Sequence, residues 1–430
     1  PPHVGRGAQQ KCWKTHAVLA AAVGFNVVSI IALVCVCSTW SAPWTVRNLI
    51  HASNEKSVSL QAERTQFAGA VYFGHQSTDT DSIGSAIGAA ELFGGQAACP
   101  MPRKDCPNLE SAYLLRLFNV DTATVLPVLG DLEDLESKKF VLVDFNDALK
   151  LPPPNTFKHM PAISKDGRWQ PVVLGIIDHH PAQHVDTKFA VHVDIRPWGS
   201  ACTILAWKFF ESGVKPSRST AGILLGGILS DTLALKGPTT SQPDRDAVER
   251  LSHLEYEGCN ILKSVGMGSV WELAVKQFEA KSEHDLDDLT TVYQSDAKDF
   301  GDQCSVSCLF CIGAVEVAGS IVKKILDMDA AQIRSAIETV KQTRAVKFAF
   351  ITVVDVLELT AVMMTDTKES SDMAETAFAK AECAKGRADS YTRVSGDSIA
   401  YYIPLGACLS RKLQLQPVLT EATCKHCEKL

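Results

Sequence analysis

Acidic and histidine side chains follow several apolar segments of this chain, at the point where each segment ends. The residues are His75, Asp79, Asp81, Asp144, His179 and Asp231. One such residue is commonly a helix cap or a turn residue, because its side chain accepts hydrogen bonds from free backbone N–H groups. Several carboxylates brought together would instead repel one another and resist burial. Divalent cations remove that penalty, so the pattern favours a two-metal site.

The mixture of oxygen and nitrogen donors narrows the choice of metal. Carboxylates together with imidazoles suit Mn²⁺, Co²⁺, Zn²⁺ or Fe²⁺, whereas shells made only of oxygen suit Mg²⁺ and Ca²⁺. Two such ions about 3.5–4 Å apart can lower the pKa of a shared water and hold it for in-line attack on phosphorus. The residue types therefore indicate metal-assisted hydrolysis at a phosphate.

These side chains need strands that carry them to one edge of a sheet. The segments "GAVYFGH", "KKFVLVDFND" and "PVVLGIIDHHP" are nearly continuous apolar runs, typical of strands buried on both faces of a parallel sheet. Helical stretches such as "CTILAWKFFESG" lie between them, and this alternation predicts a doubly wound α/β domain. Sites in such sheets form at the carboxyl ends of the strands, where His75, Asp144 and His179 would meet. The run "AGILLGGILSDTLALKGPTT" predicts a tightly packed helix that ends at Asp231.

The chain divides into three parts in this interpretation. Residues 1–66 form an N-terminal hydrophobic segment and a linker, residues 67–282 the α/β domain with the metals, and residues 288–425 a smaller mixed α/β domain. The connection near residues 281–287 would let the second domain close over a substrate and exclude water. Residues 152–168 are Pro-rich and predict an inserted loop.

The N-terminal segment has the composition of a membrane or targeting sequence. It contains no Asp or Glu before Glu55, and residues 17–37 are apolar over nearly the ~20 residues that a membrane helix needs. A permanent anchor and a secretory or organelle-targeting segment cleaved near Ser41 both remain open, and either places the catalytic body on the lumenal side. The net charge of -7 gives no indication of a nucleic-acid partner.

The fourteen cysteines raise a choice between zinc, disulfides and core packing. Cys304, Cys308 and Cys311 lie close together, and Cys424 and Cys427 form a C-x-x-C pair. The spacing is similar to that of a zinc site. The first group, however, lies in an apolar, strand-like run, which favours core cysteines or disulfides.

Six motifs spread over the chain resemble those of one enzyme family. In order they are "GHQSTDTDS", "VLVDFN", "IIDHHP", "LSDTLALKGPT", "DAKDF" and "SRKLQLQPVLT". They resemble the motifs of family II inorganic pyrophosphatases, manganese- or cobalt-dependent members of the DHH phosphoesterase superfamily with a DHHA2 C-terminal domain. The resemblance covers residues 71–422. It implies hydrolysis of inorganic pyrophosphate to two phosphates by a hydroxide activated between two Mn²⁺ ions, or Co²⁺ in their place. Mg²⁺ would arrive with the substrate, and relatives of this kind often form homodimers.

Carried over by motif, the resemblance also implies a role for each site residue. One metal would be held by His75, Asp79, Asp144 and Asp231, and the second by Asp81, Asp144, His179 and Asp231. Asp178 would orient the histidines, and His180 would contact the substrate beside the leaving phosphate.

Cations on the second domain complete the implied site. Lys298, Arg411 and Lys412 match the family's substrate-binding residues. Hydrolysis of pyrophosphate requires positively charged side chains, because negative charge spreads over the phosphoryl oxygens as the P–O bond breaks. Arg offers a bidentate fork and Lys a point charge.

The chain departs from the family pattern at two motifs. Ser77 and Thr78 replace Asn-Pro in the first, which predicts a changed loop with the ligands retained. Phe145 replaces a histidine in the second, which removes a polar neighbour of Asp144 and leaves its effect on turnover and metal preference open.

Two rival functions remain. The first is an exopolyphosphatase of the same superfamily, against which His75 argues because that branch typically has Asn there. The second is a non-catalytic, membrane-tethered interaction module. The presence of both bridging carboxylates, Asp144 and Asp231, argues against it.

Overall fold

The computed structural model describes residues 60–153, 172–185, 187–283, 288–295, 297–301 and 308–428. The predicted membrane or targeting run, most of the predicted inserted loop and residues 284–287 of the predicted connection lie outside these ranges. Within them, no helix combines the length and the apolar character that crossing a bilayer requires. The membrane prediction therefore stays a prediction.

The first domain is built on a five-stranded sheet with the order β2-β1-β3-β4-β5. All four neighbouring pairs are parallel. The strands are β1 (Ala70–Phe73), β2 (Gly95–Ala97), β3 (Lys139–Val143), β4 (Val172–Asp178) and β5 (His192–Ile195). Val71 and Phe73 pack in one buried cluster and Tyr72 in another, so both faces of β1 are covered. The α/β prediction is confirmed, and burial on both faces explains the continuous apolar runs.

Close packing between helices of this domain brings the helix that ends at Asp231 to the start of the helix that follows β1. The helices of this domain are α3 (Thr80–Phe93), α4 (Leu109–Leu117), α5 (Thr122–Val125), α6 (Ala201–Ser212), α7 (Arg218–Asp231), α8 (Gln242–Ser252) and α9 (Val270–Lys281). A Cβ on Gly227 of α7 would lie 2.5 Å from the Sγ of Cys202 on α6. A Cβ on Gly84 of α3 would lie 2.6 Å from the same sulfur. The glycines therefore allow α3, α6 and α7 to meet, which carries Asp231 toward the first turn of α3.

The second domain contains a six-stranded sheet with the order β12-β13-β11-β10-β9-β8. Among the described strands of this sheet only β9 and β10 pair in parallel, and the other neighbours are antiparallel. The mixture of helices and strands agrees with the predicted mixed α/β domain. The strands are β8 (Ala297–Phe300), β9 (Phe310–Val317), β10 (Phe348–Asp355), β11 (Thr360–Thr365), β12 (Tyr391–Ser395) and β13 (Ser398–Gly406). The helices are α10 (Leu289–Ser295), α11 (Ser320–Leu326), α12 (Ala330–Arg344), α13 (Lys368–Phe378) and α14 (Gln416–Cys427), the last preceded by the π-helical turn η8 (Arg411–Leu415).

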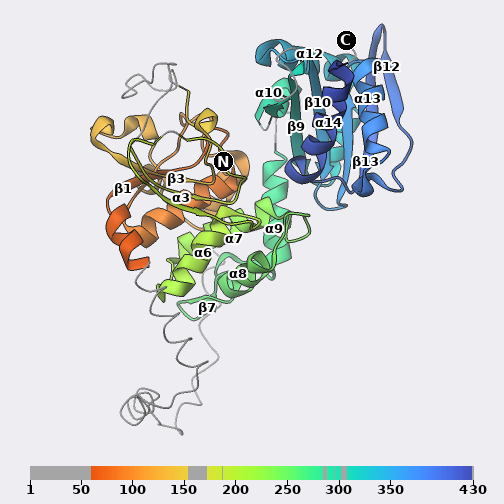
Figure 1. Ribbon diagram of the computed structural model, residues 1–430. Coiled ribbons are helices and arrows are strands. Elements are labelled where there is room, and N and C mark those ends of the chain that lie inside the picture. Colours follow the sequence, from red (N-terminus) through yellow and green to blue (C-terminus); the bar gives the residue numbers. More distant parts are fainter. Residues whose placement is uncertain are drawn as a thin grey trace, which may run out of the picture.

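Helix α9 leads from the first domain to the second (Figure 1). A two-stranded hairpin of β6 (Glu255–Tyr256) and β7 (Cys259–Asn260) lies between α8 and α9 in the sequence. The predicted boundaries near residues 282 and 288 agree with this position but stay a prediction.

Several cysteines form disulfides. Cys308 pairs with Cys427, while Cys311 is buried and free. Cys424 is also disulfide-bonded. The preference for disulfides and core cysteines over zinc is therefore confirmed for these residues, and Cys304 lies outside the described residues.

Candidate metal centre

The first motif forms the turn between β1 and α3. Asp79 is the N-cap of α3, and its Oδ1 accepts hydrogen bonds from the backbone N (2.9 Å) and the Oγ (2.8 Å) of Ser82. Its Oδ2 lies 3.2 Å from Nε2 of His75. A Cβ on Gly74 would lie 2.3 Å from the Cβ of Ser82, so this turn requires glycine. The capping and metal-binding interpretations are therefore compatible, because each uses a different oxygen of Asp79.

Asp81 is fully buried against the N-terminus of α6. Its carboxylate accepts hydrogen bonds from Ser200 Oγ (2.5 Å), Ala201 N (2.6 Å) and Cys202 N (2.8 Å). The free N–H groups of a helix N-terminus favour a negative charge. Burial first, and then the charges of Asp144 and Asp231, nevertheless raise the pKa of Asp81 well above its usual range. The site therefore brings together more negative charge than α6 alone can balance.

Asp144 sits where β3 ends in a sharp turn. Its φ is +64°, in the left-handed region, and its backbone N donates to the Ile177 carbonyl at 2.9 Å. Phe145 turns into the core and packs against Phe73 with ring centroids 5.9 Å apart. Non-glycine residues in this conformation are uncommon and cluster at functional sites. The turn separates the two side chains, so Phe145 stabilises the strand end while Asp144 faces the site.

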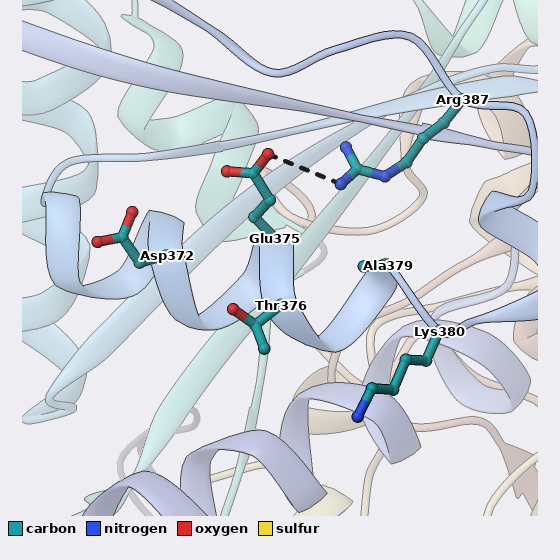
Figure 2. A pocket seen from close by; sticks show the side chains of 6 residues that line it. All are labelled: Asp372, Glu375, Thr376, Ala379, Lys380 and Arg387. Carbon is teal, nitrogen blue, oxygen red and sulfur yellow. Dashed lines mark ion pairs between the residues drawn. The ribbon is translucent and has the colours of Figure 1, made fainter.

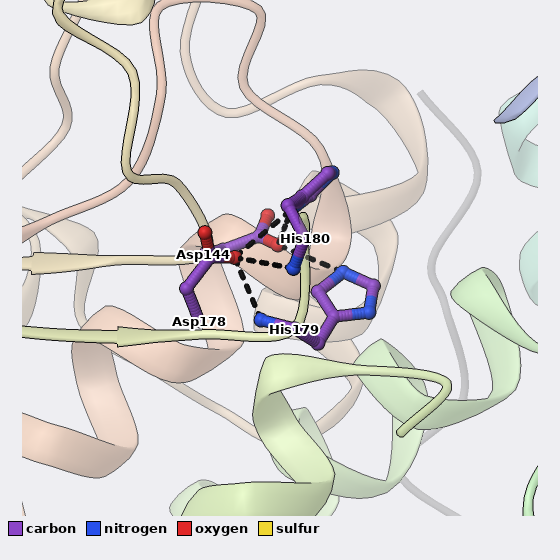
Figure 3. Close-up of side chains that lie close together, drawn as sticks. All are labelled: Asp144, Asp178, His179 and His180. Carbon is purple, nitrogen blue, oxygen red and sulfur yellow. Dashed lines mark hydrogen bonds and ion pairs between the residues drawn. The ribbon is translucent and has the colours of Figure 1, made fainter. Parts of the chain in front are cut away.

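The turn after β4 is organised by Asp178. Its Oδ1 accepts hydrogen bonds from the backbone N of His179 (2.7 Å), and from the backbone N (3.1 Å) and Nδ1 (2.9 Å) of His180 (Figure 3). Asn146 donates from Nδ2 to the other oxygen of Asp178. The sequence motifs assign no role to Asn146, although its position just after a strand end was a usable signal. Asn146 therefore holds the Asp178 carboxylate in place, and that carboxylate in turn orients the ring of His180.

The tautomer of His179 is set by its surroundings. Its Nδ1 lies 3.1 Å from the carbonyl oxygen of Trp198, which can only accept, so Nδ1 carries the hydrogen. In the neutral ring Nε2 then presents a lone pair. That atom lies 3.2 Å from Asp144 Oδ1, 3.4 Å from Asp231 Oδ2 and 3.7 Å from Asp81 Oδ2. A lone pair facing three carboxylates is unfavourable unless a proton or a metal ion lies between them.

The ligand atoms form overlapping groups in which all members lie within 4.8 Å of one another. One group is His75, Asp79 and Asp144; a second is Asp81, Asp144, His179 and Asp231; a third is Asp144, Asp178, His179 and His180. Asp144 belongs to all three, whereas Asp231 joins only the second. Among the described residues, the buried atoms His75 Nδ1, Asp144 Oδ1 and His179 Nε2 have no hydrogen-bond partner. The residues fit two divalent metal ions that share Asp144.

The negative charges of the clustered carboxylates favour the protonated forms of several groups in the site. Burial lowers the pKa of His75, but Asp79 and Asp144 outweigh it and raise that pKa to about 9. Burial and the charges of Asp79 and Asp144 raise the pKa of Asp231 well above its usual range. Asp144 behaves oppositely: burial would raise its pKa, but the imidazole rings of His179 and His75 close to its carboxylate outweigh burial and keep that pKa well below the usual range. Metal binding must therefore displace protons from the raised groups.

The predicted cations of the second domain differ in how the structure places them. Lys412 lies in η8, where burial lowers its pKa and the charges of Asp231, Asp144 and Asp178 oppose that change. Its ammonium is thus within electrostatic reach of the carboxylate cluster. Arg411 begins the same turn. Lys298 lies on the edge strand β8, where its backbone pairs with Ile312, and its substrate role stays a prediction.

A surface pocket of about 470 Å³ lies on the second domain (Figure 2). It is lined by Asp372, Glu375, Thr376, Ala379, Lys380 and Arg387. Arg387 lies 3.9 Å from Glu375 in a loose ion pair. None of the predicted site residues lines this pocket, so it is separate from the metal centre.

Comparison with known proteins decides the family. The family model described as "DHH family, N-terminal domain" matches residues 70–228. A Streptococcus suis protein described as a manganese-dependent inorganic pyrophosphatase is 30% identical over 269 residues, which cover 62% of this chain and 77% of the relative. The chain belongs to the manganese-dependent inorganic pyrophosphatase family. A family member from Streptococcus thermophilus is 28% identical over 81% of this chain and 97% of its own length.

Other comparisons cover shorter stretches or only the fold. A family member from Streptococcus agalactiae is 32% identical over 201 residues, and that match spans 59% of its length. A crystal structure of a Methanococcus jannaschii protein, described as a family II inorganic pyrophosphatase, has a TM-score of 0.57 and 22% identity, and covers 82% of this chain and 98% of its own. At that identity the likeness shows the fold alone, including the second domain.

Proposed function

We propose that this chain hydrolyses inorganic pyrophosphate to two phosphates with a pair of Mn²⁺ ions. One observation carries the proposal: Asp144 is shared by groups of ligand atoms that include a histidine lone pair with no other partner. His75, Asp79 and Asp144 would hold one ion, and Asp81, Asp144, His179 and Asp231 the other. When bound, such a pair supplies an activated water and neutralises charge developing at phosphorus.

The chain's own residues prepare this site in two ways. The carbonyl of Trp198 holds His179 in the tautomer that directs Nε2 at the carboxylates. Asp178 accepts from Nδ1 of His180, which leaves Nε2 of His180 able to face a substrate phosphate. Asp178 is therefore a positioning residue, and His180 is the residue that we propose contacts the substrate.

Positive charge from the second domain would bind the substrate. Lys412 already lies within electrostatic reach of the carboxylates, and Arg411 shares its turn. Placed against pyrophosphate, a guanidinium fork and an ammonium offset the charge that spreads over the leaving phosphoryl group. Lys298 is the third proposed contact, and Mg²⁺ is proposed to enter with the substrate.

A metal-replacement assay tests the proposal. The purified protein is stripped of metal and given pyrophosphate or long-chain polyphosphate with Mn²⁺, Co²⁺, Mg²⁺ or Zn²⁺. We expect phosphate release from pyrophosphate with Mn²⁺ or Co²⁺. Release from polyphosphate alone would replace the proposal by an exopolyphosphatase, and no release from either substrate would favour the interaction module.

A pair of variants tests the role of the second group of ligands. Asp231→Asn should sharply lower Mn²⁺-dependent hydrolysis, whereas Asp131→Asn, at an exposed carboxylate, should not. An unchanged rate for Asp231→Asn would remove the two-metal basis of the proposal.

The disulfides indicate the kind of cellular compartment in which the protein is located. Cys99–Cys106, Cys308–Cys427 and Cys383–Cys408 all lie within the described residues. Such bonds persist in oxidising compartments. We propose that the catalytic body faces a secretory or organelle lumen and is tethered by, or cleaved from, the N-terminal segment. Thiol labelling of the protein in intact cells tests this, since reduced cysteines at these positions would contradict it.

A further inference from the structure

Lys281 joins two carboxylates that belong to different domains. It is the last residue of α9, the helix that leads from the first domain to the second (Figure 1). Its Nζ lies 3.6 Å from Oε2 of Glu110 on α4, in the first domain. The same Nζ donates to Oε2 of Glu316 on β9, in the second domain. A single ammonium is therefore shared across the junction.

The first-domain side of this bridge reaches the metal centre. Glu110 is fully buried, and its Oε2 also accepts a hydrogen bond from the Oγ of Ser230 at 2.9 Å. Ser230 is the residue before Asp231 in the last turn of α7. Gln277 of α9 donates from Nε2 to Oε1 of Glu110 at 2.9 Å and to the Gly226 carbonyl of α7 at 3.1 Å. Glu110 thus fixes the end of the helix that presents Asp231.

The second-domain side is held at two points. Glu316 lies next to the end of β9, which pairs with β10 along its whole length. The backbone N of Ala318, two residues later, donates to the buried Oγ of Ser282 at 3.1 Å. Lys281 and Ser282 therefore each hold the same end of β9. A change in the angle between the domains would have to break or remake both contacts.

We infer that Lys281 is a positioning residue that couples the orientation of the second domain to the end of the helix carrying Asp231. Lysine suits this role, because an ammonium can bond to several acceptors at once. Burial raises the pKa of Glu110, and the charge of Lys281 opposes that change. Removing Lys281 would therefore leave the buried Glu110 without the ammonium that favours its charged form, and the partly exposed Glu316 without its ion-pair partner. The inference rests on the proposed function only for its catalytic readout.

Separate variants test the two halves of the bridge. Glu316→Gln weakens the second-domain half, so the KM for pyrophosphate should rise about tenfold, equivalent to the loss of one partly buried ion pair, while Mn²⁺ affinity stays within about twofold. Glu110→Gln weakens the other half, so Mn²⁺ affinity should fall about tenfold, as for outer-shell changes at other metal sites.

Variants of Lys281 test the shared ammonium. Lys281→Met should show both effects, and Lys281→Arg should restore most of each because it keeps the charge. Lys276→Met, at an exposed lysine of the same helix, is the matched control. Thermal denaturation of every variant shows whether it is folded.

Two readouts do not depend on catalysis. Small-angle scattering should show a broader distribution of interdomain distances for Lys281→Met than for Lys276→Met, and Mn²⁺ titration should show weaker binding. A Lys281→Met protein with the KM, the Mn²⁺ affinity and the scattering profile of the control would overturn the inference, even if its melting temperature fell. A wild-type protein without pyrophosphatase activity would refute the proposed function, and the two physical readouts would still decide on the bridge.

Discussion

The sharpest test of the metal centre is the substitution Asp144→Asn. Asp144 is the residue common to all three groups of ligand atoms. Its oxygens lie 3.4 Å from Nε2 of His75 and 3.2 Å from Nε2 of His179. Asparagine has nearly the same size and keeps one oxygen, so the substitution removes the charge and little else. The expected effect is therefore electrostatic.

The magnitude follows from the distances. At an effective dielectric constant of about 20, the Asp144 carboxylate attracts a unit positive charge at the position of His75 Nε2, 3.4 Å away, by about 5 kcal/mol. The attraction for a divalent ion bound between these side chains would be at least as large. If the amide oxygen and local relaxation recover half, about 2.5 kcal/mol is lost for each ion that Asp144 contacts. Two ions then lose about 5 kcal/mol of binding free energy, which corresponds to a fall of about 10³-fold or more in kcat/KM at an Mn²⁺ concentration that just saturates the wild-type protein.

Steady-state phosphate release at the Mn²⁺ concentration that just saturates the wild-type protein measures this loss, and Mn²⁺ titration measures the affinity. Asp131→Asn, at an exposed aspartate, is the matched control and should behave as wild type. In the metal-free variant the substitution removes the attraction between Asp144 and the two histidines as well as the repulsion from Asp81 and Asp231, and thermal denaturation checks that the variant is folded. A kcat/KM within tenfold of wild type at unchanged Mn²⁺ affinity would refute the idea that Asp144 is shared by two ions.

Three further outcomes follow from the structure. The pKa of His75 is raised from 6.5 to about 9, and that of Asp231 is also raised. The proton on His75 therefore stabilises the metal-free fold fully below about pH 6.5, and this stability is lost as the pH rises to about 9. The increase in melting temperature on adding Mn²⁺ under argon should consequently grow over that window, and a flat profile would contradict it. Lys412→Ala should raise the KM for pyrophosphate about tenfold without weakening Mn²⁺ binding, because the ammonium that is lost attracts the substrate and repels the metal ions. A KM equal to that of the wild type would exclude Lys412 from the substrate site. Replacing Cys383 and Cys408 by serine should lower the free energy of unfolding by about 3.5 kcal/mol for a 25-residue separation, as measured in denaturant, and equal stability would show that this bond contributes nothing.

Much of the site could be predicted from the sequence because it depends on residue patterns within single strands and on the residue that ends each strand. Parallel strands buried on both faces read as apolar runs, and the residue that ends each run must lie at one edge of the sheet. His75, Asp144 and His179 were predicted to meet for this reason, and the structure brings them together. Asp231 was harder, since it ends a helix: the small-residue run before it predicted a tightly packed helix, and its motif assigned it to the metals.

Other features depend on contacts that no local pattern encodes. The carbonyl of Trp198 that sets the tautomer of His179 comes from a segment 19 residues away. Asp81 is held by the N-terminus of α6, about 120 residues later in the chain. The sequence predicted that Phe145 removes a polar neighbour of Asp144, and the structure adds that the left-handed turn at Asp144 directs Phe145 into the core.

The sequence by itself determined the kinds of ligand, their order along the chain and the sheet edge at which they gather, because these follow from residue type and strand periodicity. The tertiary structure alone decided which atoms face one another. It pairs Asn146 with Asp178, and it places Lys281 between Glu110 and Glu316 across the domain junction. Such pairings join residues far apart in the chain, and their geometry is fixed only when the helices and sheets have packed.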